Sequence, residues 1–252
     1  MITDCKVTDL HERSEEDGFV VTGIQCLRAG ISDVIQVNEG DLVFLQNGSM
    51  TDASSLGSMT TAPKRLTKAD SGGWALWKKL ADGRPGFGNP AAFNRCIAQS
   101  VWESFTVTLK NPAFFDMMNQ LSGNEAGTGG LVTFKDSNWM MSIVLPHQPH
   151  FINQPSDVQV FWGYSLFPDR IGNFVAKPMS ACNGAEILQE LCGHLRFDLE
   201  VVASANCIPG TMPYITSMFM PRQLGDRPLP VPEGSRNFAF ISQFGIPTCG
   251  DG

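Results

Sequence analysis

The sequence predicts an α+β fold, in which helices and antiparallel strands alternate irregularly along the chain. Short segments rich in Val, Ile and Phe indicate strands, and apolar residues spaced three or four apart indicate helices. No internal repeat or long linker separates them. The 252 residues suffice for one large domain or two small ones, and 42% hydrophobic with 17% charged residues is typical of a globular chain with a core.

The first 45 residues are expected to form a small β meander that leads into a buried strand. The meander strands span residues 6–10, 18–24 and 34–37, and residues 42–45 (LVFL) read as the buried strand. Asn47-Gly48-Ser49 ends that strand. Open α/β sheets form ligand crevices where a buried strand gives way to small polar residues, although Asn-Gly also ends strands simply because it tolerates positive φ.

Helices and strands alternate in the rest of the chain. Pro90 stands near the first position of one expected helix, and Gly83 and Gly123 follow the ends of two others. The expected helices span residues 74–81, 90–100, 113–122 and 184–195, and the expected strands span residues 104–109, 131–134, 139–145, 158–164 and 237–244.

Composition excludes several classes of protein. The net charge of −7, without a run of Lys or Arg, argues against a nucleic-acid partner. No apolar run approaches the roughly 18 residues of a membrane span, and the polar, acidic first 18 residues are no secretory signal. Seven scattered cysteines without a C-x-x-C pair indicate reduced thiols in a cytoplasmic protein, with neither a disulfide framework nor a zinc site.

Several long segments resemble one family in the same order. The segment at residues 47–63 reads NGSMTDASSLGSMTTAP, that at 74–90 reads WALWKKLADGRPGFGNP, and that at 212–228 reads MPYITSMFMPRQLGDRP. Together they resemble the oleate hydratases, also called myosin-cross-reactive antigens, which are flavoproteins that add water to unsaturated fatty acids. Shorter matches are WESFTVT (102–108), GTGGLVTFKDSNW (127–139), QPHF (148–151), WGYSLF (162–167) and KPM (177–179).

The resemblance implies part of a flavin-linked, glutathione-reductase-like FAD domain together with an α+β substrate domain. Residues 1–63 would be the β-rich part of the FAD domain, residues 64–232 the fatty-acid substrate domain, and residues 233–252 a return strand to the FAD domain. Proline-rich residues 228–232 mark the last border. The resemblance implies FAD as cofactor, with contacts from Asn47, Gly48, Ser49, Met50, Gln243 and Phe244.

Two segments are expected to bind the fatty acid. Gln148 and His150 match the family motif that contacts the substrate carboxylate, and imidazole can donate a hydrogen bond to such a group. Val144 and Pro146 replace a threonine and an asparagine of well-known members, so head-group anchoring is expected to differ. The second segment offers hydroxyls and one cation beside methionines that suit an alkyl chain. Its expected substrate residues are Tyr214, Thr216, Ser217 and Arg222.

For both segments, a purely structural role stays open as the alternative interpretation. His150 is alternatively a histidine whose hydrogen bonds are satisfied within the fold, and residues 212–222 are alternatively an ordinary core strand. Arg222 could pair locally with Asp226 as readily as with a ligand.

Two features of the family have no counterpart in this sequence. The chain has no G-x-G-x-x-G; the closest segment, residues 127–130, is a glycine-rich turn that opens a strand, so no helix N-terminus holds a pyrophosphate. The acid and base residues credited with catalysis also lie toward the family's N-terminus. No residue of this chain is therefore assigned a catalytic role, and the end departs from the family pattern after Phe244. We expect a partial form that is inactive alone.

The expected function is that of a fatty acid hydratase acting on the cis double bond of unsaturated fatty acids. A noncatalytic lipid-binding fragment and an FAD-dependent oxidoreductase of similar architecture are the alternatives. The resemblance also admits a homodimer and peripheral membrane contact during substrate uptake.

Overall fold

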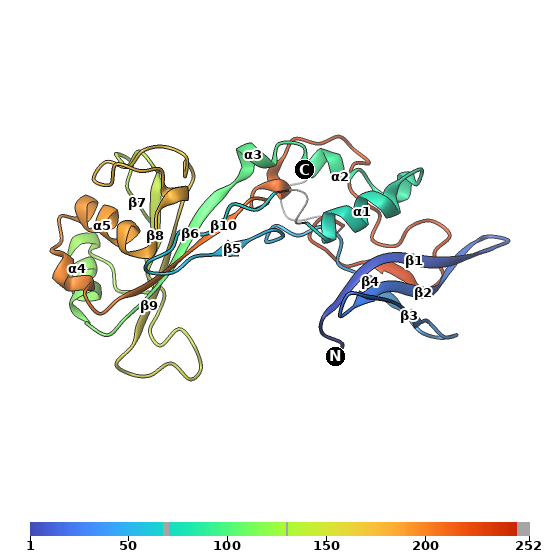
Figure 1. Ribbon diagram of the computed structural model, residues 1–252, viewed down its shortest axis with the longest axis horizontal. Coiled ribbons are helices and arrows are strands. Elements are labelled where there is room, and N and C mark those ends of the chain that lie inside the picture. The colour runs from blue at the N-terminus through green and yellow to red at the C-terminus, as the bar shows by residue number, and fades with distance from the viewer. Residues whose placement is uncertain (68–70, 130, 246–252) are drawn as a thin grey trace. The chain divides into compact units, whose positions relative to one another are not determined.

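The computed structural model describes residues 1–67, 71–129 and 131–245, and the chain divides into two compact units (Figure 1). Unit 1 comprises residues 1–53, 67–100 and 214–252, and unit 2 comprises residues 54–66 and 101–213. The limits of the two units differ from the predicted domain borders at residues 63 and 232. The helices between residues 73 and 100 belong to unit 1, because they pack against the first strands. The assignment of flavin and substrate domains stays a prediction.

Two sheets form the scaffold of unit 1. An antiparallel meander has the strand order β1-β2-β3, as the sequence predicted, and a separate two-stranded sheet pairs β4 with β11 in parallel. The strands are β1 (Cys5–Glu15), β2 (Gly18–Arg28), β3 (Ile31–Gln36), β4 (Val43–Leu45) and β11 (Phe238–Phe240).

The helices of unit 1 are short. They are α1 (Gly73–Ala81), η2 (Pro85–Phe87), α2 (Pro90–Asn94), α3 (Ile97–Ser100) and η5 (Ser217–Phe219). In α1 the predicted helical spacing is confirmed, because Trp74, Trp77 and Leu80 are all buried. The core of this unit combines α1 with both sheets: Leu10, Val21, Val43, Leu76, Leu80, Phe87, Phe238 and Phe240.

Two predictions for unit 1 were wrong in detail. The strand at residues 42–45 is not buried throughout: Val43 faces the core, whereas Leu42 and Phe44 are 65% and 58% exposed, because successive side chains of a strand point to opposite faces. The helix expected at residues 90–100 is interrupted at Arg95 and Cys96. The Arg95 guanidinium there donates to the Pro221 carbonyl at 2.9 Å.

Unit 2 is built on one six-stranded antiparallel sheet with the order β5-β10-β6-β9-β8-β7. The predicted strands at 104–109, 131–134, 139–145 and 158–164 are confirmed with shifted ends. The strands are β5 (Ser55–Leu56), β6 (Trp102–Leu109), β7 (Val132–Thr133), β8 (Met141–Val144), β9 (Gln159–Ser165) and β10 (Asn206–Met212).

Strand β10 was missed, and residues 213–222 form no core strand, because regular strand structure ends at Met212. Pro209 within β10 argues against a central strand when only the sequence is read. In the structure Pro209 stands opposite Phe105 of β6, and its carbonyl accepts from the Gly57 amide at 2.8 Å.

The glycine-rich turn predicted at residues 127–130 is present at Gly127, where φ is +85°. Gly130 lies outside the described residues.

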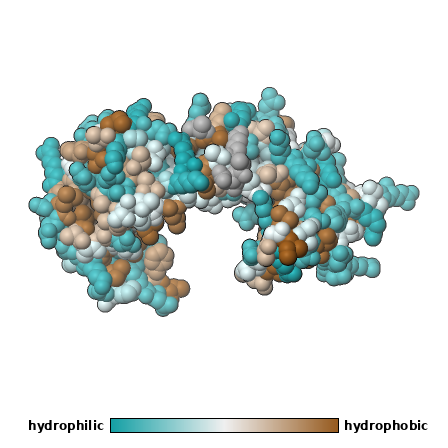
Figure 2. Space-filling model, viewed as in Figure 1, coloured by the Kyte–Doolittle hydropathy of each residue, from teal (hydrophilic) through white to brown (hydrophobic). Residues whose placement is uncertain are grey.

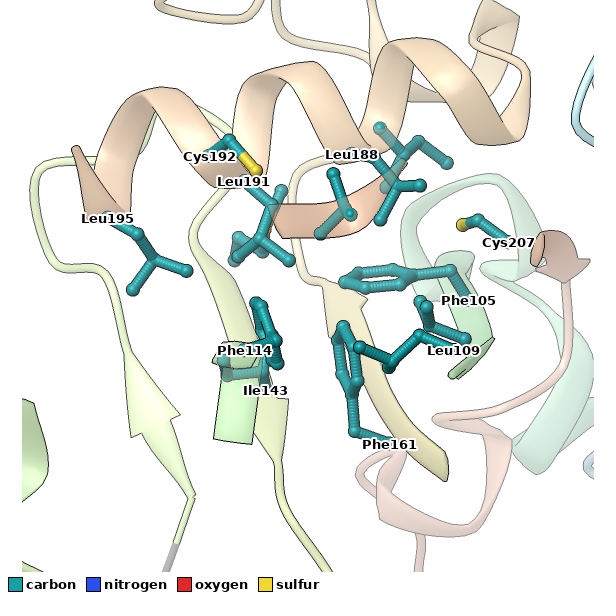
Figure 3. Packing of buried hydrophobic residues seen from close by; sticks show 14 of the residues in the cluster. Phe105, Leu109, Phe114, Ile143, Phe161, Leu188, Leu191, Cys192, Leu195 and Cys207 are labelled. Carbon is teal, nitrogen blue, oxygen red and sulfur yellow. The ribbon is translucent and has the colours of Figure 1, made fainter. Parts of the chain in front are cut away.

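Two helices cover one face of this sheet. They are α4 (Ala113–Ser122) and α5 (Gly184–Leu195), and both match the predicted ranges. Gly123 ends α4 with a left-handed φ of +70°, and Asn183 and Glu186 form a capping box at the start of α5. Figure 3 shows Leu188, Leu191 and Leu195 of α5 directed toward the aromatic rings of the sheet and α4. The short helices η3 (Met179–Ala181) and η4 (Leu199–Val202) complete the unit.

A buried carboxylate on α5 holds the neighbouring loop. Glu190 is 0% exposed and accepts hydrogen bonds from the amides of Asn173, Phe174 and Val175 at 2.7–2.8 Å. The His194 ring lies 3.2 Å from the same carboxylate. Because all of these donors are directed at one side chain, the loop conformation depends on Glu190.

We predict that Glu190→Ala lowers the free energy of unfolding of unit 2 by about 3–5 kcal/mol, because three backbone amides lose their buried acceptor. Urea denaturation followed by circular dichroism measures the change. Glu125→Ala is the control, because Glu125 is exposed and its loss should change stability by no more than about 0.5 kcal/mol. Equal effects of the two substitutions would contradict the role given to Glu190.

Candidate functional site

The carboxyl ends of the two parallel strands in unit 1 lie side by side. Val43 stands opposite Phe238, and Leu45 opposite Phe240. Two residues beyond each strand, the Ser242 hydroxyl donates to the Asn47 side-chain oxygen at 2.5 Å. Both side chains are buried, with 1% and 2% of their surface exposed. This hydrogen bond joins two residues that are 195 positions apart in the sequence. It lies at the carboxyl ends of the strands, where ligands of open α/β sheets bind.

The Asn47 amide leaves one donor without a partner. Its Nδ2 atom is buried and makes no hydrogen bond with the residues that the structure describes. A buried donor in this state costs about 1–3 kcal/mol. A carbonyl oxygen or ring nitrogen of a bound group is a chemical partner that would satisfy it.

The turn after Asn47 requires glycine. Gly48 has φ of +61°, and a Cβ atom built on it would lie 3.2 Å from the Phe244 ring and 3.3 Å from Trp74. The Trp74 indole donates to the Ser49 carbonyl at 3.0 Å. The turn is thus held against aromatic side chains from α1 and from the segment after β11.

Five aromatic side chains form a cluster beside this turn, which we call the aromatic cluster: Trp74, Trp77, Phe93, Tyr214 and Phe244. Trp74 stacks on Tyr214 with ring centroids 5.2 Å apart, and Phe244 meets Trp74 edge-on at 5.0 Å. Burial raises the pKa of Tyr214, and the adjacent Ser71 hydroxyl partly opposes that increase. The phenol therefore stays protonated at neutral pH.

The structure brings the predicted cofactor residues of the two segments together. Gly48 lies against Phe244, Asn47 accepts a hydrogen bond from Ser242 beside Gln243, and the Ser49 carbonyl accepts one from Trp74. Met50 is half-buried, and Gln243 is exposed. Sequence reasoning missed Ser242 and Trp74. Ser242 fell within the strand predicted at residues 237–244, which was too long: β11 ends at Phe240 and leaves Ser242 two residues beyond it, as Asn47 stands beyond β4.

The predicted substrate residues of unit 1 lie in a turn and the 3-10 helix η5. The Ser217 hydroxyl donates to the Tyr214 carbonyl of its own turn at 2.6 Å, and the Thr216 hydroxyl donates to the Ser100 carbonyl at the end of α3 at 3.1 Å, so both stabilise backbone of unit 1. Arg222 donates to the Met218 carbonyl at 3.1 Å. It lines an open depression of about 410 Å³ together with Phe219, Leu224 and Arg227, among others.

Gln148 and His150 belong to unit 2. Gln148 uses its side chain within the loop: it donates to the Pro146 and Val160 carbonyls and accepts from the Val160 amide and the Gln154 side chain. The His150 ring is exposed and packs against Phe151 and Trp162 at 4.7 and 5.2 Å. The predicted substrate residues are thus divided between the units.

Cysteine and metal chemistry find no support in the described part of the chain. Its cysteines are free thiols, as predicted, and burial raises the pKa of Cys182 and of Cys207 to about 12. Such thiols are poor nucleophiles at neutral pH. No group of three or more His, Cys, Asp or Glu side chains within the described residues could hold a metal ion.

None of the described helices has the length and hydrophobicity needed to cross a bilayer. On the face shown in Figure 2, hydrophobic residues lie in small groups interspersed with polar ones.

Comparison with known proteins identifies the family. A model described as the MCRA family matches residues 1–246. The chain belongs to the MCRA family. The oleate hydratase of Streptococcus pyogenes serotype M49 (strain NZ131) is 38% identical over 253 residues, which cover 96% of this chain and 43% of that protein. The linoleate hydratase of Lactiplantibacillus plantarum is 34% identical over 254 residues, covering 91% of this chain and 44% of that protein.

These matches confirm the resemblance that the sequence motifs carried. The MCRA-family chain spans less than half the length of the two curated relatives.

We predict that Gly48→Ala destabilises unit 1 by about 2–4 kcal/mol, because alanine meets both a left-handed φ and the two aromatic rings. Gly40→Ala is the matched control: Gly40 has φ of +87° but no atom within 4 Å of an added Cβ, so it should lose only about 1–2 kcal/mol. Urea unfolding followed by tryptophan fluorescence measures both. Equal losses would show that the rings move aside.

Proposed function

We propose that this chain is part of an FAD-containing fatty acid hydratase, which adds water to the cis double bond of unsaturated fatty acids. The observation that carries the proposal is the edge formed by β4 and β11, where Asn47 and Ser242 meet and one buried amide donor lacks a partner. Membership of the MCRA family and the names of its two relatives support the choice of substrate.

The carboxyl ends of β4 and β11 would suit a flavin that takes no part in redox chemistry. Adding water to an alkene involves no net electron transfer, so FAD, when bound, would supply a flat polar ring system rather than redox chemistry. Asn47 would donate to that ring from its free Nδ2, and the backbone of Gly48 and Ser49 would approach it closely. Gln243 and Phe244 would form the second wall.

The fatty acid has one candidate contact surface on each unit, and each surface is proposed separately. On unit 1, Arg222 with Phe219 offers a cation beside exposed hydrophobic surface. The exposed imidazole of His150 offers a donor for the carboxylate from unit 2. The proposal gives this chain binding and positioning roles, and it assigns the proton transfers of hydration to no residue here.

We expect the isolated chain to bind FAD weakly and to form no 10-hydroxystearate from oleate, because it contains no pyrophosphate-binding glycine motif. Flavin fluorescence titration and product analysis by mass spectrometry measure the two properties. Purification as a stoichiometric yellow protein, or product above the blank, would contradict this expectation. Consumption of NAD(P)H with FAD present would favour an oxidoreductase instead.

We predict that His150→Ala weakens oleate binding by about 1–2 kcal/mol, the size of a hydrogen bond to a charged group. The loss should shrink for methyl oleate, which lacks the carboxylate charge. Isothermal titration calorimetry with both ligands measures it.

His147→Ala is the matched control, since His147 is exposed in the same loop and should not change the affinity. Equal losses for the acid and the ester would show that His150 acts through packing; Arg222→Ala would then be the variant to compare. If oleate does not bind at all, the proposed function fails for this chain.

A further inference from the structure

One carboxyl group lies in the core of unit 2 with little to stabilise its charge. Glu103 is on β6 and is 0% exposed. It faces the same side of the sheet as Phe105 and Val107, because alternate residues of a strand share a face. The Thr211 hydroxyl donates to Oε2 at 2.7 Å, while Oε1 has no hydrogen-bond partner among the described residues.

The charged groups around Glu103 do not neutralise it. Arg65 follows β5 and lowers the pKa of Glu103, whereas Asp169 follows β9 and raises it. These two side chains form an ion pair with each other at 2.8 Å. The Cys182 thiol, which follows η3, is the other titratable neighbour. Strands β10 and β9 contribute the hydroxyls of Thr211 and Ser165 opposite it, and Ser165 donates to the Trp139 carbonyl.

Glu190 in the same unit provides the contrast. Three backbone amides and a histidine surround that buried carboxylate. Glu103 has one hydroxyl, and within the described residues it forms no ion pair. A buried carboxylate with a single neutral donor is unfavourable, and such a group binds a proton instead.

We propose that Glu103 is a proton-binding switch: the fold of unit 2 holds it uncharged, and its ionisation loosens the end of the sheet where β5, β10 and β6 meet. Burial raises the pKa of Glu103 to about 7 from an ordinary 4.5, with Thr211 partly opposing. The change of charge therefore falls near neutral pH.

The adjoining strand is weakly held and would respond first. Strand β5 pairs with β10 through only two residue pairs, and one of them joins Ser55 to Thr211, the hydrogen-bond partner of Glu103. The segment 57–66 follows β5 directly and carries Arg65. A negative charge on Glu103 draws water toward this end of the sheet and weakens the attachment of that segment.

The pH dependence of stability has a defined sign. Because the pKa of Glu103 is higher in the folded than in the unfolded chain, the uncharged carboxyl stabilises the fold fully below about pH 4.5, and this contribution is lost as the pH rises through about 7. Wild type and Glu103→Gln should have similar melting temperatures at pH 4. At pH 8.5 the variant should melt higher by roughly 5 °C or more.

Glu125→Gln is the matched control, because Glu125 is exposed and its difference from wild type should be the same at both pH values. A Glu103→Gln difference that does not change with pH would overturn the proposal. Should that variant fail to fold, the wild-type chain labelled with carboxyl-¹³C glutamate decides: we expect one glutamate resonance to titrate near pH 7, and titration of every glutamate below about pH 5.5 would overturn the proposal.

The location of the response can be measured separately. Hydrogen exchange of residues 54–66, corrected for intrinsic rates, should accelerate between pH 6 and pH 8 in the wild type and not in Glu103→Gln. Equal protection in both proteins across this range would show that ionisation does not loosen the sheet end.

Discussion

The parallel pairing of β4 with β11 is the constraint on which unit 1 depends. Only three residue pairs form it, yet it joins segments separated by most of the chain. The Asn237 side chain strengthens the junction by donating to the Val21 carbonyl and accepting from the Val21 amide, so β11 is also tied to the meander. Loop-closure entropy grows only with the logarithm of length, so a few buried contacts such as Phe238 and Phe240 can offset it.

Sequence patterns within one segment predicted α4 and α5 well. They missed strand β10, because that strand depends on pairing with distant segments. Helices α4 and α5 match their expected ranges, because apolar spacing together with residues such as Gly123 defines a helix within one segment. Strand β10 contains Pro209 and becomes recognisable only beside its partners. The exposed face of β4 was equally hidden, since a run of apolar residues does not reveal how many faces of a strand are covered.

The candidate site likewise combines residues that local sequence patterns indicate with contacts that only the folded structure shows. Asn47 and Gly48 stood out as the end of a strand, but no spacing rule joins them to Phe244, and only the family resemblance suggested that contact. The stacking of Trp74 on Tyr214 and the burial of Glu103 depend on how distant segments pack. For Glu103, strict alternation with Phe105 and Val107 placed it on an apolar face, a signal that was present in the sequence.

The distribution of unit 1 over three chain segments sets an order of assembly during translation. All of unit 2 is synthesised before Phe238, so the sequence of its sheet and helices is complete while β4 still lacks its parallel neighbour. Until then, Val43 of β4 lacks the cover of Phe238 and Phe240. A chain that ended between residues 213 and 238 would therefore contain every segment of unit 2 but leave β4 without its parallel partner.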